Sequence, residues 1–514
     1  MPNPPSATSE IKRRRRGAAV GLLILALAVT AALVSFWMMN KSKPAPDAAA
    51  KSIAVLPFKP LAAESRNESL ELGMADTLIN KLSALRQLIV RPISDVRKYI
   101  SLEQDPIAAG RELGVDYVLE GNLQIVGEKT RATVRLLSVK DGRAVWTDKY
   151  DQQWSNVFEL QDAIAERIAG ALALELTGTE KKQLAKHYTE STEAYLLYSL
   201  GMYSRTGQGG GRLKERLEKS IEYFEQAIKK DPNYALAYVG LSSAYSALGF
   251  RGFWPPDEAR QKYEWAARKA VELDDTLPDA HAALAYVKKT DWDWAGAERE
   301  FKRALELDPN SLETHSLYVS FQVDVGRLDE ALVYAKRTDE LGLRRPGYMA
   351  SQQAYVYFHL RQYDQAIELY LKAKERNPNR ARANFHLAEA YLGKKMYEEA
   401  IAEMQKAVAF DNAPERWNGY PILAYAYAVA GKRDEAQKIL DEQKRLAEHS
   451  YISPYNFAII YTGLGDQDQA FEWLEKAYQE RSEALLHLKS RPMFDSLRSD
   501  SRYIELLRKM NLAP

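Results

Sequence analysis

The 514-residue sequence contains no cysteine, which removes several classes of chemistry at once. Disulfide bonds, cysteine-ligated zinc, iron–sulfur clusters and a cysteine nucleophile are all excluded. The seven histidines form no H-E-x-x-H pair or other close metal-binding spacing, and the chain has no G-x-S-x-G turn of a serine hydrolase. The sequence therefore predicts a protein that is not an enzyme and that needs no cofactor or metal.

An excess of charge of either sign is also missing. Lys and Arg total 71, Asp and Glu total 70, and five of the basic residues lie together at positions 12–16. The rest of the chain is therefore slightly acidic, with no bulk electrostatic reason to bind nucleic acid. We expect no nucleic-acid partner.

A long uncharged run follows the basic cluster. Residues 18–39 comprise 22 residues without a charged side chain, enough for a helix to cross the ~30 Å hydrocarbon core of a bilayer. The alternative is a cleaved signal peptide, whose apolar region normally spans about 7–15 residues and ends at small side chains. Because this run is longer and ends in large side chains, we predict an uncleaved transmembrane helix. The basic tail at 1–17 would then be cytoplasmic, and residues from about 41 onward would lie outside the cytoplasm at the inner membrane.

Residues 51–180, after a linker at 40–50, alternate between strand-like and helix-like patterns. Asn67 is expected to cap the first helix, although Asn67-Glu68-Ser69 also spells a glycosylation site, and Gly114 is expected to end the second helix. The order β-α-β-α-β-β-β-α predicts a small α/β domain with helices packed on a mixed sheet. The strand-like runs are 52–58, 88–92, 116–126, 130–140 and 143–150, and the helix-like runs are 67–85, 106–113 and 157–172.

Three stretches of this region resemble the amino-terminal α/β domain of TolB and its relatives. They are residues 52–58 (SIAVLPF), 114–121 (GVDYVLEG) and 141–151 (DGRAVWTDKYD). The resemblance covers about 120 residues and implies the fold of that domain. The β-propeller of TolB is missing, so the role of TolB does not carry over.

The second half of the chain is periodic. An alanine recurs at intervals of 34, 35, 34, 36 and 34 residues, which is the period of the tetratricopeptide repeat. A small side chain at this place lets the second helix of a repeat approach the first, and Gly326, Gly431 and Gly465 are expected at the intervening turns with positive φ. The alanines are Ala297, Ala331, Ala366, Ala400, Ala436 and Ala470.

These patterns together predict a fold class and a domain order. The fold class is a small α/β domain followed by an all-α tetratricopeptide-repeat superhelix, with one N-terminal transmembrane helix. The domains are a tail at 1–17, the membrane helix at 18–39, a linker at 40–50, the TolB-like domain at 51–180, about eight repeats at 190–480 and capping helices at 481–514.

The domain order resembles bacterial membrane proteins that join a TolB-like domain to tetratricopeptide repeats, as in the extracytoplasmic part of CadC-type regulators. Residues 291–301 (DWDWAGAEREF) and 491–500 (RPMFDSLRSD) are similar to the repeat signature and the carboxy-terminal cap of that group. In many such relatives a cytoplasmic output domain precedes the membrane helix. Only about 16 residues precede it here, so we do not expect this chain to carry a transcriptional or enzymatic output.

Three local patterns have a functional and a structural interpretation, and the structural one is favoured in each case. His386 and Glu389, three residues apart on a helix, are expected to form a hydrogen bond rather than a metal site. The glycine-rich residues 207–211 lack the Lys-Ser/Thr of a phosphate loop and are expected to link two helices. Trp292 and Trp294 are expected to bury against the next helix rather than to form a ligand cage.

What remains as a candidate site is the concave surface that the first helices of the repeats would line. Aromatic side chains with one or two charges suit an extended peptide or a partner helix, although each aromatic could instead pack between repeats. The carboxylate clamp of chaperone-binding members is not matched, because Ala282, Ser316, Ser351 and Phe385 stand where its basic or amide side chains would be. The predicted groove residues are Tyr286, Lys289, Tyr348, Ser351, Tyr355, Phe358, Arg382, Phe385, Glu389, Tyr425 and Tyr455.

The resulting hypothesis is a membrane-anchored extracytoplasmic scaffold or adaptor that binds a protein or peptide partner through the concave surface of its repeats. The alternative is a sensory component that detects a ligand with the TolB-like domain and relays the signal to a separate cytoplasmic partner. The sequence leaves the partner, the pathway and the oligomeric state open.

Overall fold

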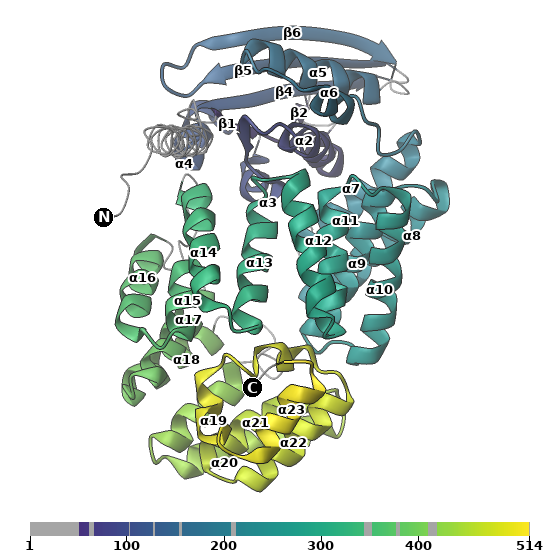
Figure 1. Ribbon diagram of the computed structural model, residues 1–514. Helices are drawn as coiled ribbons and strands as arrows, with labels where there is room; N and C mark the ends of the chain where they lie inside the picture. Colours follow the sequence, from purple (N-terminus) through teal and green to yellow (C-terminus); the bar gives the residue numbers. More distant parts are fainter. Residues whose placement is uncertain are drawn as a thin grey trace, which may run out of the picture. The chain divides into compact units, whose positions relative to one another are not determined.

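The computed structural model describes residues 51–60, 66–101, 103–126, 129–153, 157–206, 212–343, 352–376, 381–409 and 419–512. This part of the chain is a mostly helical tetratricopeptide-like superhelix with a small sheet region at its N-terminal end (Figure 1).

This description corrects the predicted fold class and the predicted inner-membrane location, both of which included a single membrane-spanning helix. Among the residues that the structure describes, no helix is both long enough and apolar enough to cross a bilayer. Residues 18–39, where the span was predicted, lie outside the described residues, as does the basic tail.

The sheet region is built on a mixed sheet with strand order β3-β1-β4-β5-β6, in which β2 also pairs with β4. β1 lies parallel to both β3 and β4, and Ile53, Ala54 and Val55 are fully buried, which explains the continuous apolar run at this position. β4, β5 and β6 form an antiparallel meander. The strands are β1 (Lys51–Val55), β2 (Lys59–Pro60), β3 (Leu88–Val90), β4 (Tyr117–Val126), β5 (Lys129–Ser138) and β6 (Ala144–Gln153).

Local signals set the ends of the helices in this region. The Asn67 side chain accepts a hydrogen bond from the Leu70 backbone N–H at 3.2 Å, which confirms the predicted cap of α2. Gly114 ends α4 with φ of 60°, as predicted. The helices are α2 (Glu68–Ser83), α3 (Ile93–Val96), η2 (Arg97–Tyr99), α4 (Pro106–Leu113), α5 (Val157–Ala171) and α6 (Gly178–Leu184).

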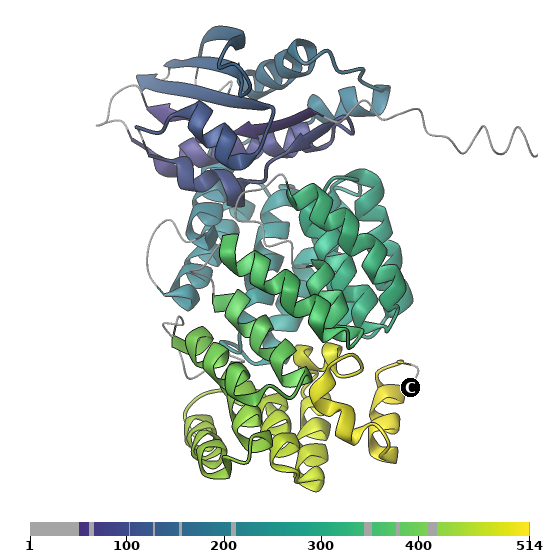
Figure 2. The ribbon, with the colours of Figure 1, turned by 90° about the vertical axis from the view of Figure 1, so that its left-hand side faces the viewer.

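Eight helix pairs follow in the described residues, and Figure 2 shows them stacked one after another from teal to yellow. Each pair packs with the next along the array. The pairs are α7 (Thr192–Thr206) with α8 (Leu213–Lys230), α9 (Ala235–Phe250) with α10 (Pro256–Leu273), α11 (Pro278–Thr290) with α12 (Trp294–Leu307), α13 (Leu312–Asp324) with α14 (Leu328–Leu343), α15 (Gln352–His359) with α16 (Tyr363–Arg376), α17 (Ala381–Gly393) with α18 (Tyr397–Ala409), α19 (Gly419–Val429) with α20 (Arg433–Ala447), and α21 (Pro454–Leu464) with α22 (Gln467–Gln479).

The recurring alanines lie where the two helices of a pair meet. All six are 0% exposed, as expected if a small side chain is needed for close packing of the helices. They are Ala297, Ala331, Ala366, Ala400, Ala436 and Ala470.

The turn inside each of these six repeats contains one residue with positive φ, five positions before the alanine. Glycine occupies three of the six positions, at Gly326, Gly431 and Gly465, as predicted. Trp292, Arg361 and Lys395 occupy the other three with φ of 59°, 63° and 62°. The backbone of the turn is therefore the same in all six repeats, and at three of them a side chain accepts a left-handed conformation that costs roughly 1–2 kcal/mol.

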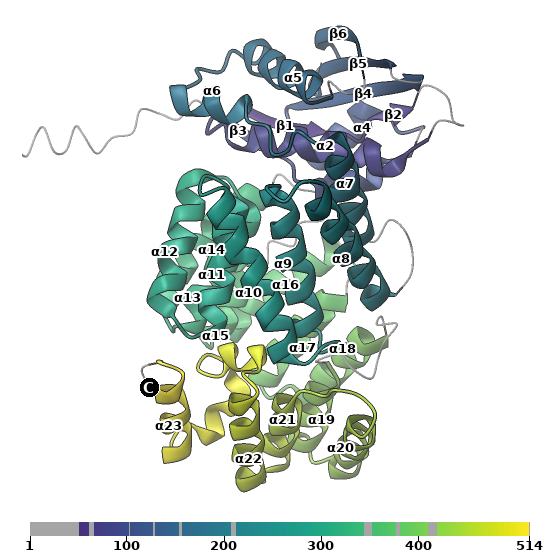
Figure 3. The same ribbon diagram turned by 90° about the vertical axis from the view of Figure 1, so that its right-hand side faces the viewer.

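The chain ends in short elements that belong to no helix pair. They are η5 (Glu483–His487), η6 (Pro492–Leu497) and α23 (Ser501–Lys509). Leu485, Leu488, Phe494 and Leu497 are each 0% exposed. This C-terminal segment is therefore part of the hydrophobic core, with α23 at the lower end of α12 and α13 in Figures 1 and 3.

Candidate partner groove

The repeats enclose a cavity of about 2520 Å³. Its walls include side chains from the first helices α7, α9, α11, α13, α15 and α17, from β3 and α3 of the sheet region, and from η5. First helices are the ones that line the inner face of a tetratricopeptide array, which is where the sequence placed the candidate site. The cavity has two parts with different chemistry.

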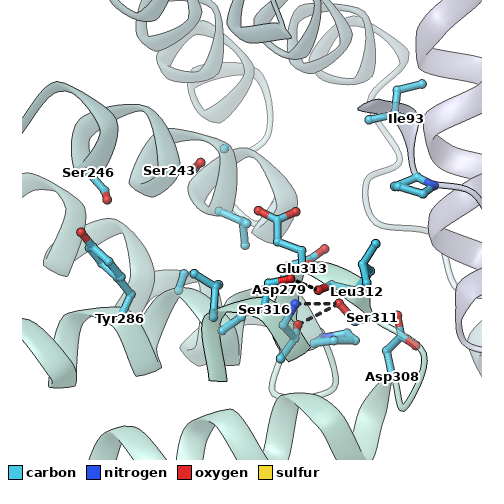
Figure 4. A pocket seen from close by; sticks show the side chains of 18 of the residues that line it. Ile93, Ser243, Ser246, Asp279, Tyr286, Asp308, Ser311, Leu312, Glu313 and Ser316 are labelled. Atoms are coloured by element: carbon cyan, nitrogen blue, oxygen red, sulfur yellow. Dashed lines mark hydrogen bonds between the residues drawn. The ribbon is translucent and has the colours of Figure 1, made fainter. Parts of the chain in front are cut away.

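The near part, lined by α9, α11 and the start of α13, is rich in hydroxyl groups and carboxylates. Figure 4 shows Ser243 and Ser246 on one wall, and Asp279, Glu313 and Ser316 gathered on the opposite wall. The start of α13 is positioned by a cap, because the Ser311 hydroxyl accepts from the Thr314 backbone N–H at 3.2 Å. Asp308, just before this cap, accepts from the Asn310 backbone N–H at 3.0 Å.

The carboxylates of the near part influence one another. Burial raises the pKa of Asp279 to about 7, and repulsion from Glu313 and Asp308 adds to this. Burial likewise raises the pKa of Asp308 to about 6. Asp279 is nevertheless exposed to the cavity, so its carboxyl group is enclosed by protein but can be reached by solvent. A cationic group that enters the near part would lower the pKa values of Asp279 and Asp308 and would be attracted by their carboxylates.

The far part of the cavity is occupied by the C-terminal segment of the chain itself. The Tyr286 hydroxyl donates to the Glu483 carboxylate. The His487 ring lies 2.7 Å from the Asp324 carboxylate, and Arg491 lies 2.7 Å from Glu389. The polar side of the segment therefore contacts α11, α13 and α17 from within the cavity.

The contacts of the far part are buried charge pairs. Lys289 lies 2.6 Å from Asp324, with side chains 6% and 0% exposed. Burial alone would raise the pKa of Asp324, but Lys289 and His487 outweigh burial and lower it. Burial alone would likewise raise the pKa of Glu389, but Arg491 and His386 lower it to about 2. Each of these charges is compensated within the protein, so none needs a ligand.

The predicted groove residues fall into three groups. Tyr286, Lys289, Tyr355, Phe358, Phe385 and Glu389 line the cavity. Tyr425 is half-buried and Tyr455 is 2% exposed, and neither lines the cavity. Tyr348 and Ser351 lie outside the described residues, and the same holds for the side chain of Arg382. Partner binding by these residues stays a prediction.

The structure describes two of the three local patterns that had both a functional and a structural interpretation. His386 lies 3.4 Å from Glu389, so the two side chains face one another as expected. Among the described residues no group of three or more His, Cys, Asp or Glu side chains could hold a metal ion. The glycine-rich residues 207–211 lie outside the described residues.

Trp292 and Trp294 pack into the protein, as the structural interpretation expected, and Trp294 lies beside Phe321 of the next helix, α13, with ring centroids 6.4 Å apart. Trp292 stacks on Tyr478 with ring centroids 5.0 Å apart, and the Trp294 indole N–H donates to the Met510 carbonyl at 2.8 Å. Both contacts join residues that are far apart in the sequence, which the local spacing could not predict.

Glu483, His487 and Arg491 were not predicted as groove residues. They are spaced four residues apart and alternate with the buried leucines Leu485 and Leu488. This alternation of one polar and one apolar side was present in the sequence and could have marked a segment lying between a core and a polar groove.

Three family models match parts of the chain. The model of the second domain of HilA/YgeH-like transcriptional regulators matches residues 49–167, and two tetratricopeptide-repeat models match residues 351–416 and 455–483. The chain therefore contains tetratricopeptide repeats and a HilA/YgeH-like domain. The predicted TolB-like and CadC-type relationships are not confirmed by these matches.

Curated relatives are similar over parts of their length. "Putative adenylate cyclase 3" of Rhizobium meliloti is 27% identical over 248 residues, which are 48% of this chain and 41% of that protein. The transcriptional regulator HilA of Salmonella typhimurium is 24% identical over 338 residues, which are 64% of this chain and 57% of HilA. The chain thus spans about half the length of the curated relatives it matches.

A similar solved structure is that of PilF from Pseudomonas aeruginosa. It is 23% identical, with a TM-score of 0.30, over 41% of this chain and 93% of that chain. Together with the repeat models, the helix pairs support an interaction scaffold, since arrays of this kind present an extended concave surface.

Proposed function

We propose that this protein is a non-enzymatic scaffold that binds an extended segment of a protein partner in the near part of the repeat cavity. The observation that carries the proposal is the difference between the two parts of one continuous cavity. The charges of the far part are paired with one another, whereas Asp279, Asp308 and Glu313 of the near part share one wall without a basic side chain ion-paired to them among the described residues.

The chemistry of the near part favours a segment with lysine or arginine side chains. At Asp279 the repulsion from Glu313 and Asp308 exceeds the attraction of Arg205, so this group of carboxylates would gain from a cation. Ser243, Ser246 and Ser316 offer hydroxyl groups that can bind the backbone of an extended chain. Arg205 also lies at this part and donates to the Ser243 hydroxyl at 3.1 Å, so the basic side chains of a partner would meet the α11–α13 wall rather than α7.

The absence of cysteine allows a direct test. A single cysteine in place of Ser316 would lie in the near part. The Ser316 hydroxyl donates to the Leu312 carbonyl of its own helix at 2.8 Å, so we expect the substitution to cost little stability. A photo-crosslinker attached to S316C should trap a partner in cells that is not trapped by V333C, a position that is 67% exposed and outside the cavity.

A charge reversal at Asp279 and Glu313 tests whether these carboxylates bind the partner. Binding of the protein trapped at S316C should fall at least tenfold in the double variant Asp279→Lys, Glu313→Lys, measured with purified components. If S316C and V333C trap the same proteins, or if the double charge reversal leaves binding unchanged, the near part is not the partner site.

A second candidate function is a sensory role for the sheet region within a signalling system. Its support is the match of residues 49–167 to a domain of transcriptional regulators, together with the names of the two curated relatives. A small ligand of this region would slow amide exchange in β1, β4 and β5 and raise the melting temperature of the full chain. If no small molecule protects these strands while the S316C crosslink succeeds, the scaffold role stands alone.

A further inference from the structure

In an open tetratricopeptide array each repeat contacts only its neighbours, so the array can flex and unfold from either end. The C-terminal segment breaks this rule here. Glu483, His487 and Arg491 contact Tyr286, Asp324 and Glu389, residues that precede them by 197, 163 and 102 positions. The segment therefore touches three repeats that are not its neighbours in the chain.

We propose that residues 478–511 form an internal brace, which closes the repeat array on itself and holds the curvature of the groove. The brace does not rest on the proposed function, because it concerns contacts within the chain and not the partner. Its consequence is that helices at the middle of the array depend for their stability on side chains near the C-terminus.

One side of the brace is polar and crosses the cavity. The His359 ring N–H donates to the Ser490 carbonyl at 3.1 Å, which adds α15 to the helices already contacted. Arg361, at the turn after α15, donates to the same carbonyl at 2.9 Å and pairs with Asp495 at 2.7 Å. Four consecutive first helices, α11, α13, α15 and α17, are thus joined by one stretch of chain.

The other side of the brace is apolar and anchors it. Leu485, Leu488 and Phe494 are each 0% exposed and belong to one hydrophobic cluster with Trp292 and Tyr455. Because this burial is continuous with the core of the last repeats, the brace is a fixed part of the fold rather than a flexible tail lying in the groove.

The two ends of the brace hold the turn between α11 and α12 at two points. Trp292 stacks on Tyr478, and the Arg481 guanidinium carbon lies 4.7 Å from the centroid of the Trp292 ring. Trp294 bonds the Met510 carbonyl, and the Asn511 side chain donates to the Trp292 carbonyl at 3.4 Å. The turn between α11 and α12 is therefore held by residues from both ends of the brace.

Hydrogen–deuterium exchange of the full chain tests the brace. Arg491→Glu places two carboxylates at the buried Glu389 site. If the brace holds the array, exchange should accelerate on the order of 100-fold in α11 and α13 as well as in α17, since a broken buried pair is strongly destabilising. Arg508→Glu, a charge reversal at an exposed position of the same segment, should leave α11 and α13 unchanged.

Two further variants keep the test decisive. Glu389→Arg with Arg491→Glu restores an ion pair of opposite orientation and should recover most of the protection in α11 and α13. Trp294→Phe removes the indole N–H that donates to the Met510 carbonyl and keeps a smaller aromatic ring beside Phe321, so it should accelerate exchange in α11 and α13 about tenfold even if R491E does not fold. Acceleration confined to α17 and the C-terminal segment in R491E, or unchanged α11 and α13 in W294F, would overturn the brace.

Discussion

Lys289 and Asp324 form an ion pair at 2.6 Å inside the groove, with side chains only 6% and 0% exposed. The sequence pattern predicted Lys289 as a cation available to a partner. In the structure its charge is already compensated, and His487 holds the second oxygen of Asp324 at 2.7 Å. The lysine is therefore part of the framework around the brace.

Breaking this pair should be costly. Asp324→Asn keeps the shape of the side chain but leaves Lys289 buried without its counter-charge, so we expect a loss of about 3–5 kcal/mol in the free energy of unfolding. Urea denaturation of the full chain measures it. Arg337→Ala removes a pair with Glu340 whose side chains are 52% and 66% exposed, and should cost less than about 1 kcal/mol. Equal effects of the two variants would mean that the buried pair contributes no more than a surface pair.

The turns with positive φ predict stability changes of opposite sign. Lys395 is exposed with φ of 62°, so Lys395→Gly removes left-handed strain and should stabilise the protein by about 1 kcal/mol. Gly431 has φ of 81°, and no atom lies within 4 Å of the place that a Cβ would take, so Gly431→Ala should destabilise by about 1 kcal/mol through backbone strain alone. Denaturation midpoints of the two variants measure these changes, and a destabilising Lys395→Gly would show that the lysine side chain has a stabilising role.

Glu483 should make the stability of the protein depend on pH. Burial raises its pKa from an ordinary value of 4.5 to about 7, against the lowering effect of hydrogen bonds from Tyr286 and Tyr263 and of the nearby Lys289 charge. The folded state thus holds this proton more tightly than the unfolded state. The associated stability is full below about pH 4.5 and is lost as the pH rises through 7, by roughly 3 kcal/mol in total.

The variant Glu483→Gln isolates this contribution, because Gln cannot ionise but keeps an acceptor oxygen for the tyrosine hydroxyls. The difference in unfolding free energy between the wild type and E483Q should shift against the wild type between pH 5 and pH 8. Glu389 and Asp324, whose pKa values are lowered, act in the opposite direction in both proteins and cancel in the difference. A constant difference across this range would mean that Glu483 stays ionised.

Phe385 and Tyr455 were predicted as equivalent groove residues, and the structure separates them. Phe385 is half-buried and lines the cavity, whereas Tyr455 is 2% exposed and packs 5.5 Å from Phe494. Tyr455→Ala should cost about 3–5 kcal/mol of stability, and Phe385→Ala less than half as much. Melting temperatures rank the two, and the reverse order would place Phe385 in the core.

The sequence by itself determined the local structure of this protein. The spacing of alanines placed the helix pairs, Asn67 and Gly114 placed helix ends, and the runs of β-branched residues placed the strands. These features depend on residues close in the chain, through the 3.6-residue period of a helix, the two-residue period of a strand and the steric freedom of glycine. The membrane-spanning helix, which the predicted fold class and location both included, was predicted from the hydropathy of residues 18–39, and the structure corrects both without describing those residues.

Only the tertiary structure decided what fills the space between the first helices of the repeats. Trp294 bonds a carbonyl 216 residues away, and Arg491 pairs with a carboxylate 102 residues away. A periodic pattern predicts which face of a helix points inward, but not what fills the space it faces. That depends on the summed rotation from one repeat to the next, which returns the C-terminal segment to α11 and α13, and the predicted groove residues Lys289 and Glu389 are buried.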